Sequence, residues 1–274
     1  MHISGKTKII GLFGYPVEHT LSPYMQNAAF SHCGIDYCYV PFSVHPDRLK
    51  NAVEAIRSLS LCGVNLTIPH KEACIPSLDQ LDEEARIIGA VNTITSKSGR
   101  LIGHNTDGRG FVMALVEQGI TIEGSRSLII GAGGASRAVA YYLSRAASNL
   151  YIYNRTRQKA EALVSALSYA GGNAMVIDDI SSVSDYDLII NATPLGLQDD
   201  DPLPLDPGLL RSSQSVCDLI YRQTPLLRQA ARKGCRTVDG LGMLLWQGVY
   251  SFELWTGMQP PAEVMRTALL SVVK

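Results

Sequence analysis

The stretch SLIIGAGGASRAVAYYL, residues 127–143, decides the fold. It predicts an apolar strand, a glycine-rich turn and a helix. Gly131 permits the tight turn, and Gly133 with Gly134 lets the backbone approach a pyrophosphate at the helix N-terminus. Ser136 stands where the GxGxxG pattern has its third glycine, so the match is imperfect. The pattern indicates a dinucleotide-binding fold, and a glycine-rich turn without a ligand is the alternative.

A basic turn follows the next expected strand, LYIYN (150–154). In NAD-binding folds an acid at the end of this strand holds the ribose 2′-hydroxyl. This chain instead has NRTR (154–157) followed by Lys159, with no acid before Glu161. An arginine can bind a 2′-phosphate through two parallel hydrogen bonds, whereas an acid would repel it. The sequence therefore favours NADP over NAD, and a solvated basic turn is the alternative.

The composition is that of a folded protein with a small-molecule partner. The chain has 274 residues, 46% of them hydrophobic and 18% charged, which is enough to bury a core. A formal net charge of −1 argues against nucleic acid or an anionic membrane as the main partner. The longest apolar stretch, 241–255, contains Gln247 and Glu253 and is too short to span a bilayer. The N-terminal residues lack the pattern of a signal peptide.

Cysteine and histidine usage indicates neither a disulfide framework nor a metal. The six cysteines show no CxxC spacing and are typical of free thiols in a reducing compartment, so a cytoplasmic location is expected. The six histidines form no HExxH or HxH cluster, so we expect no metal site. A monomer and a homodimer are both compatible with the sequence.

Strand-like and helix-like runs alternate along the whole chain, which predicts an α/β protein built largely from parallel units. Helices are expected from an N-cap at Ser22 to Gly34, over 46–59, over 107–118, and in two segments after Gly242. Expected strands are 8–14, 37–42, 62–68, 91–95 and 100–105 (joined by a Ser98-Gly99 turn), 127–131, 150–154, 174–178, 187–191, 215–220 and 235–238.

Three polar segments interrupt the first part of the chain at expected strand ends. In GVNLTIPHKEA (63–73), strand geometry would place Asn65, Thr67 and Lys71 on one face. AVNTI (90–94) and GHNTDGRG (103–110) add Asn92, Asn105, Thr106 and Asp107. Such groups suit a polyhydroxylated ligand, and a lysine near a carboxylate can move a proton. Alternatively, the asparagines are turn residues, Asp107 is a helix cap and Lys71 is a surface charge.

These motifs together resemble the shikimate dehydrogenase family over essentially the whole chain. EHTLSPYMQNAAF, NLTIPHK, GAVNTI, HNTDGRGF, GAGGASRA, NRT, NATPLG and GMLLWQG occur in the family's order and approximate spacing. The resemblance implies NADP-dependent interconversion of shikimate and 3-dehydroshikimate, on the route to aromatic amino acids. It also implies a substrate-binding domain, 1–105 with about 247–274 packing back, and a Rossmann-type NADP-binding domain, 106–246, with the active site in the cleft between them.

The resemblance also assigns roles to individual residues. Lys71 would deliver a proton to the forming alkoxide, and Asp107 would hydrogen-bond the substrate hydroxyl. Further substrate contacts would be Thr20, Ser22, Asn65, Thr67, Asn92, Tyr221 and Gln247. The implied cofactor contacts are Gly131, Gly133, Gly134, Ala135, Asn154, Arg155, Thr156 and Lys159, with Thr193, Leu219, Gly240 and Met243 near the ribose and nicotinamide.

Three positions depart from the family pattern. Thr20 replaces the first serine of the carboxylate-binding motif, and Gln26 replaces a histidine. Only Arg222 and Gln223 separate Tyr221 from Thr224, where the family more often has four residues. Thr20 and this short loop leave open a quinate-type dehydrogenase. A non-catalytic NADP-binding regulator is a further alternative, against which the presence of both Lys71 and Asp107 argues.

Overall fold

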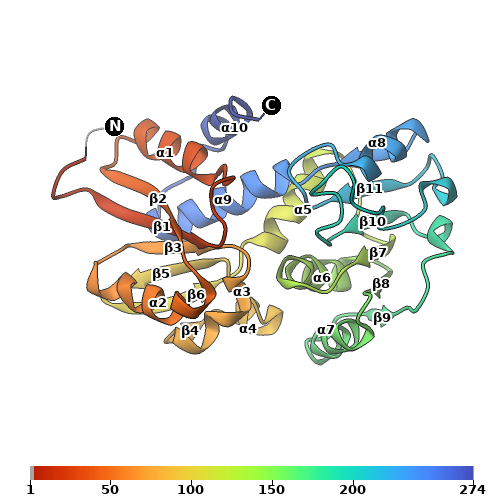
Figure 1. Cartoon of the computed structure of the whole chain (residues 1–274), viewed down its shortest axis with the longest axis horizontal. Coiled ribbons are helices and arrows are strands. Elements are labelled where there is room, and N and C mark those ends of the chain that lie inside the picture. Colours follow the sequence, from red (N-terminus) through yellow and green to blue (C-terminus); the bar gives the residue numbers. More distant parts are fainter. Residues whose placement is uncertain (1–2, 274) are drawn as a thin grey trace. The chain divides into compact units, whose positions relative to one another are not determined.

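A computed structural model describes residues 3–273 and separates the chain into two compact units. The first unit combines the chain up to Thr106 with the residues from Leu245 onward, and the second is Asp107–Leu244. Each unit has its own sheet (Figure 1). None of the described helices is both long and apolar enough to cross a membrane. The described residues also contain no group of three or more His, Cys, Asp or Glu that could hold a metal ion.

The first unit contains a mixed six-stranded sheet in the order β2-β1-β3-β5-β6-β4. Its strands are β1 (Lys8–Gly14), β2 (Tyr37–Ser43), β3 (Gly63–Leu66), β4 (Gln80–Leu81), β5 (Thr93–Lys97) and β6 (Arg100–His104). β1 pairs in parallel with β2 and β3, whereas β5 runs antiparallel to both β3 and β6. Ser98 and Gly99 join β5 to β6 with positive φ angles of 52° and 77°, as a tight hairpin requires.

Helices from both ends of the chain cover this sheet. They are α1 (Ser22–His32), α2 (Leu49–Ser58), α3 (His70–Ala73), α4 (Glu83–Ile88), α9 (Leu241–Thr256) and α10 (Ala262–Leu270). The rings of Phe30 in α1 and Phe252 in α9 stack with centroids 5.6 Å apart. Trp255 Nε1 donates to the Ile94 carbonyl at 3.0 Å. A Cβ at Gly63 would lie 2.2 Å from that carbonyl oxygen, so the strand must have glycine there.

Three expectations for this unit are wrong in detail. Leu21 precedes α1 as its cap, and Ser22 is the first helical residue, followed by Pro23, which is favoured at a helix start. The third strand ends at Leu66 rather than continuing to residue 68. Lys71 consequently lies on the short helix α3, so strand alternation does not determine its direction. The sequence reasoning also missed β4 and α4.

The second unit has a six-stranded, entirely parallel sheet in the order β12-β11-β10-β7-β8-β9. The strands are β7 (Arg126–Ile130), β8 (Asn149–Tyr153), β9 (Ala174–Val176), β10 (Leu188–Asn191), β11 (Ser215–Asp218) and β12 (Arg236–Val238). The chain order reverses direction at the β7/β10 pair, and in such sheets ligands bind outside the carboxyl ends of the strands at this switch point. The sheet thus places the glycine turn after β7 at the expected dinucleotide position.

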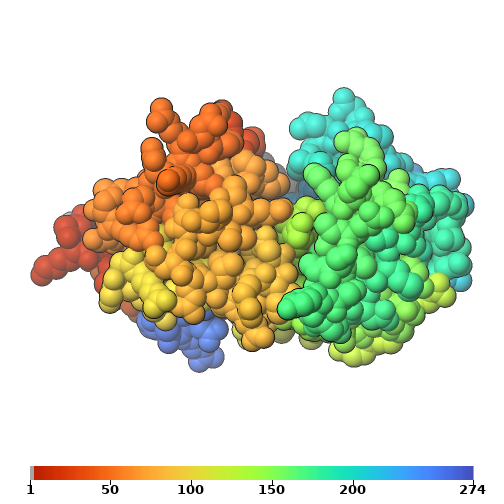
Figure 2. Space-filling model, turned by 90° about the horizontal axis from the view of Figure 1, so that it is seen from below, coloured from red at the N-terminus to blue at the C-terminus, as the bar shows by residue number. Residues whose placement is uncertain are grey.

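Four helices belong wholly to the second unit: α5 (Asp107–Glu117), α6 (Gly134–Ala146), α7 (Arg157–Tyr169) and α8 (Pro225–Arg232). Leu128, Ile189, Val216 and Leu227 form part of the core. α7, green in Figure 2, lies at the surface of this unit and ends at the almost fully exposed Tyr169. The sequence predicts all six strands of this unit in this order, but it does not predict α7 and α8.

Candidate functional site

The glycine turn after β7 has the geometry that its sequence predicts. Gly131 adopts a φ of +117°, and its N–H donates to the Tyr153 carbonyl at 2.8 Å. A Cβ at this position would lie 2.8 Å from the Ala192 carbonyl oxygen, so only glycine fits. The turn therefore brings the loops after β7 and β10 into close contact.

Ser136 explains the departure from the glycine pattern. Its side chain is fully buried, and its Oγ donates to the Gly131 carbonyl at 2.6 Å, fastening α6 to the turn. Gly133 caps α6 without a side-chain hydrogen bond, and a Cβ there would meet nothing within 4 Å. Gly134 and Ala135 begin the helix, where backbone N–H groups lack partners within the helix. This open, donor-rich end fits a pyrophosphate.

The turn after β8 contains both paired and unpaired cations. Arg157 forms ion pairs with Glu161, at 2.7 Å, and with Asp178. Asn154 Nδ2 donates to the Thr156 carbonyl at 2.8 Å, which shapes the turn. Arg155 and Lys159 are exposed and have no ion-pair partner within residues 3–273. These two side chains are therefore accessible to a ligand, and their binding of a phosphate stays a prediction.

Thr193, Leu219 and Gly240 all follow carboxyl ends of strands at one edge of the sheet. Thr193 Oγ1 donates to Asn191 Oδ1 at 2.6 Å, so the threonine hydroxyl forms a hydrogen bond within the loop after β10. A Cβ at Gly240 would lie 2.4 Å from the Leu219 carbonyl oxygen and 2.8 Å from the Tyr221 ring, which excludes any side chain there. Met243 is buried in the first turn of α9.

Sequence reasoning missed a buried carboxylate in this unit, Asp218 at the end of β11. Its Oδ2 accepts from Asn191 Nδ2 at 3.0 Å and from Thr224 Oγ1 at 2.9 Å, and its Oδ1 accepts from the Ile220 N–H at 3.1 Å. Burial raises the pKa of Asp218, against the effect of these hydrogen bonds. The sequence did not mark this aspartate as functional, because aspartate is a common residue in the turns that follow strands.

Asp107 and Tyr221 lie close enough to influence each other. Asp107 is the buried first residue of α5, and Tyr221 lies in the loop after β11. Although 45% of Tyr221 is exposed, loss of water around its hydroxyl raises the pKa of the phenol, and the charge of Asp107 raises it further. Both predicted site residues belong to the second unit, and the charge of Asp107 adds to the rise in the pKa of the Tyr221 phenol.

In the first unit, Asn65 is fully engaged by its neighbours. It is 4% exposed, and its Oδ1 accepts from the Tyr39 hydroxyl at 2.7 Å. Its Nδ2 has three acceptors: the Asn92 carbonyl at 3.0 Å, Thr93 Oγ1 at 3.0 Å and Ser251 Oγ at 3.2 Å. Sequence reasoning missed Tyr39, Thr93 and Ser251, because their hydroxyls become partners only when distant segments pack together.

Asn92 and Gln247, two predicted substrate contacts, lie in the same network. Asn92 Nδ2 donates to Thr106 Oγ1 at 2.8 Å and to Gln247 Oε1 at 3.3 Å, while its Oδ1 accepts from the Thr106 N–H at 2.8 Å. Thr106 Oγ1 in turn donates to the Gln247 carbonyl at 3.0 Å. Asn105 has a separate, turn-like role, because its Nδ2 donates to the Ala90 carbonyl at 2.9 Å.

The remaining predicted residues of this unit lie on short, anchored segments. Lys71 is held through its carbonyl, which accepts from the Val91 N–H at 2.7 Å beside Asn92. The adjacent His70 is buried and donates from Nε2 to the Val44 carbonyl at 2.7 Å. Thr20 and Ser22 lie at the start of α1, where Thr20 Oγ1 accepts from the Ser22 N–H at 3.4 Å. Thr67 has no side-chain hydrogen bond within residues 3–273.

Gln26, which departs from the family pattern, is completely buried and contacts α9. Its Nε2 donates to the Gly248 carbonyl at 2.9 Å, next to Gln247, so it helps to hold this part of the helix. Among the described residues its Oε1 has no hydrogen-bond partner.

Comparison with known proteins assigns the family. Residues 12–94 match the shikimate dehydrogenase substrate binding domain, 114–195 match shikimate / quinate 5-dehydrogenase, and 240–270 match the shikimate 5′-dehydrogenase C-terminal domain. A protein of Desulforamulus reducens named shikimate dehydrogenase (NADP(+)) is 48% identical, over 97% of this chain and 96% of that protein. The chain belongs to the shikimate dehydrogenase family.

Solved shikimate dehydrogenases share the whole fold. A crystal structure of a shikimate dehydrogenase in complex with NADP+ aligns with a TM-score of 0.93 and 42% identity, over 100% of this chain and 98% of that chain. The enzyme of Thermus thermophilus, in complex with NADP(H) and shikimate, aligns with a TM-score of 0.89 and 38% identity, over 97% and 100% of the two chains. The predictions of the family and of a two-domain α/β fold are confirmed.

The two polar residues that flank Leu66 should differ in what they contribute to stability. We expect Asn65→Leu to lower the free energy of unfolding by about 1–3 kcal/mol, because it leaves buried hydroxyls such as that of Tyr39 without a partner. Thr67→Val keeps the shape of the side chain, so it should change the free energy of unfolding by less than about 0.5 kcal/mol. Urea unfolding of both variants measures the difference. Equal losses would show that the Asn65 network does not hold the unit together.

Proposed function

We propose that this protein is an NADP-dependent shikimate dehydrogenase, which reversibly reduces 3-dehydroshikimate to shikimate in aromatic amino-acid biosynthesis. The full-length likeness to relatives named shikimate dehydrogenase (NADP(+)) carries this proposal. The geometry of the turn after β8 supports the cofactor choice, since Arg155 and Lys159 are exposed cations, and the two carboxylates near them, Glu161 and Asp178, are paired with Arg157.

We further propose that the two units divide the binding work. The first unit would bind shikimate through Thr20, Ser22, Thr67, Asn92 and Gln247, with Asn65 orienting the others. The second unit would bind NADP along the glycine turn, the basic turn and the loops after β10, β11 and β12, and would supply Asp107 and Tyr221 to the substrate.

The proposed reaction needs one hydride and one proton. NADPH, when bound, would supply the hydride for the ring carbonyl carbon. Lys71 would give its proton to the oxygen that becomes an alkoxide, because an ammonium is a compact donor whose pKa responds readily to its surroundings. Asp107 would accept a hydrogen bond from the substrate hydroxyl and so orient the ring.

We also propose a cytoplasmic location, which rests on the cysteine usage: all six cysteines are free, and burial raises the pKa of the Cys74 thiol to about 12. A thiol with so high a pKa is almost wholly protonated at neutral pH and so chemically inert.

The test of this function is cofactor absorbance with purified protein, combining shikimate or quinate with NADP or NAD. We expect substantial activity with shikimate and NADP and much weaker activity in the other three combinations, because the 2′-phosphate meets Arg155. A preference for quinate or NAD would reject the proposed specificity. If all four combinations were silent while NADPH still raised Tm, the protein would bind the cofactor without catalysis.

Lys71→Ala should lower kcat by about 10²–10⁴-fold, the usual contribution of a positioned general acid or base. NADP affinity, measured by fluorescence titration, should change little, because Lys71 lies in the first unit. Lys50→Ala, an exposed lysine on α2, is the matched control and should turn over like the parent protein. Unchanged turnover of Lys71→Ala would remove this lysine from the mechanism.

Arg155→Ala should weaken NADP binding far more than NAD binding, because only NADP carries the phosphate that the guanidinium can bind. Dissociation constants for both cofactors measure the effect. Arg157→Ala is the matched control: this neighbour is already paired with Glu161 and Asp178, so its loss should affect both cofactors little. A parallel loss for both cofactors in Arg155→Ala would mean that the arginine acts on the fold of the turn.

A further inference from the structure

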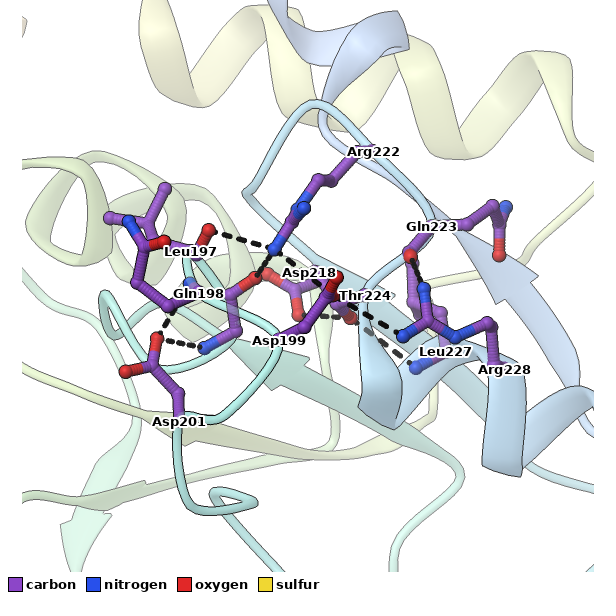
Figure 3. A network of polar contacts seen from close by, with 11 residues as sticks. Leu197, Gln198, Asp199, Asp201, Asp218, Arg222, Gln223, Thr224, Leu227 and Arg228 are labelled. Carbon is purple, nitrogen blue, oxygen red and sulfur yellow. Dashed lines mark hydrogen bonds and ion pairs between the residues drawn. The ribbon is translucent and has the colours of Figure 1, made fainter.

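Arg222 joins two loops that follow neighbouring strands of the second unit. It lies in the short loop between β11 and α8, and its Nη2 donates to the Gly196 carbonyl at 2.9 Å and to the Leu197 carbonyl at 2.7 Å (Figure 3). Gly196 and Leu197 belong to the loop after β10, the strand that pairs with β11. One side chain thus holds the tips of two loops at the carboxyl edge of the sheet, where a dinucleotide fold places its ligand.

The loop that receives Arg222 is itself well ordered by hydrogen bonds. Asp201 Oδ2 accepts from the Gly196 N–H at 3.0 Å and from the Gln198 N–H at 2.9 Å, and these bonds lower the pKa of the carboxyl group. Gly196 has a φ of +107°, and a Cβ there would lie 3.3 Å from the Thr224 side chain. The two carbonyls are therefore presented to Arg222 from a fixed backbone.

The bases of the same two loops are tied independently. Asn191 ends β10 and Thr224 caps α8, and both donate to the buried Asp218 Oδ2, at 3.0 and 2.9 Å. The loop that contains Tyr221 is consequently anchored at its far end by Thr224. Between Tyr221 and Thr224 only Arg222 and Gln223 remain. Arg228 Nη1 donates to the Gln223 carbonyl at 2.7 Å, and Arg222 supplies the side-chain contacts that join this short loop to the loop after β10.

The residue that this loop presents is Tyr221, which immediately precedes Arg222. Its phenol ring packs against Gly240, where an added Cβ would lie 2.8 Å from the ring. A rotation of the loop about its anchored end would move this phenol, whereas the cofactor's basic turn after β8 lies on the other side of β7 in the sheet order. An effect of Arg222 should therefore appear in the substrate step and leave the 2′-phosphate contacts unchanged.

We propose that Arg222 is a positioning residue for the dehydrogenase reaction: by binding the carbonyls of Gly196 and Leu197 it holds Tyr221 in the place where it meets substrate. This rests on the proposed function. The ion pairs that Asp199 makes with Arg222 and Arg228, each 3.4 Å long, contribute little, because the Asp199 side chain is 71% exposed. The two carbonyl bonds carry the effect.

Steady-state kinetics of the full chain with shikimate and NADP tests this proposal. We expect Arg222→Ala to lower kcat/KM for shikimate by about 10–100-fold, in the range that small misplacements cause. The ratio of the dissociation constants for NADP and NAD should stay within about twofold, because the basic turn that would bind the 2′-phosphate is untouched. Arg222→Lys retains a donor and should recover part of the loss. Asp199→Asn, which removes both ion pairs and leaves the two carbonyl bonds of Arg222, and Arg232→Ala, an exposed arginine on α8, should both behave like the parent protein.

A double-mutant cycle separates positioning from a general structural role. If Arg222 acts through Tyr221, then Arg222→Ala should cost little further activity in a Tyr221→Ala background. Additive losses, no effect of Tyr221→Ala alone, or unchanged kinetics of Arg222→Ala would each overturn the inference while leaving the proposed function standing. Should Arg222→Ala fail to fold, Arg222→Gln enters the same cycle. An inactive parent protein would overturn the proposed function, and this inference with it.

Discussion

The first unit depends on the hydrogen bonds that Asn92 makes with Thr106 and Gln247. This unit is assembled from two stretches of chain, one ending at Thr106 and one beginning at Leu245, and the buried amide of Asn92 binds both. Each such bond contributes only about 1 kcal/mol net, but leaving one of its buried groups unpaired costs about 1–3 kcal/mol. The network therefore adds little to the stability of the fold, but it selects one packing of α9 against β5, because any other packing would leave buried polar groups without hydrogen-bond partners.

The second unit uses the same chemistry at the edge of a different sheet. Asn191 at the end of β10 donates to the buried Asp218 at the end of β11, which also binds Thr224. In both units a strand-end asparagine fixes loops that carry the proposed site residues. The glycines complement these amides, because Gly131 and Gly240 allow backbone segments to approach at distances that a side chain would prevent. Rigid loop bases and close backbone contact together define where a ligand can lie.

The sequence predicts most of the architecture, because apolar periodicity and turn residues are local signals. The strand at 8–14, the Ser98-Gly99 hairpin turn and the glycine turn at Gly131 all appear as expected. Contacts between distant segments were not predictable. Asn65 and Thr67 look alike in the pattern, yet only Asn65 is enclosed by Tyr39, Thr93 and Ser251. Ser136 likewise gains its role from a carbonyl that the folded turn brings near it. The direction expected for Lys71 rested on strand alternation, which does not apply because the strand stops at Leu66.

The return of α9 and α10 to the first unit has a consequence for protein synthesis. A ribosome releases the N-terminal residues first, and domains generally fold as units while the chain emerges. The stretch up to Thr106 nevertheless lacks Phe252, Trp255 and Gln247, which fill and close its core. The continuous Asp107–Leu244 unit is complete before the unit that precedes it. The nascent chain thus keeps an unfinished apolar surface until the residues from Leu245 onward leave the exit tunnel, so the first unit is completed only after the second has been synthesised.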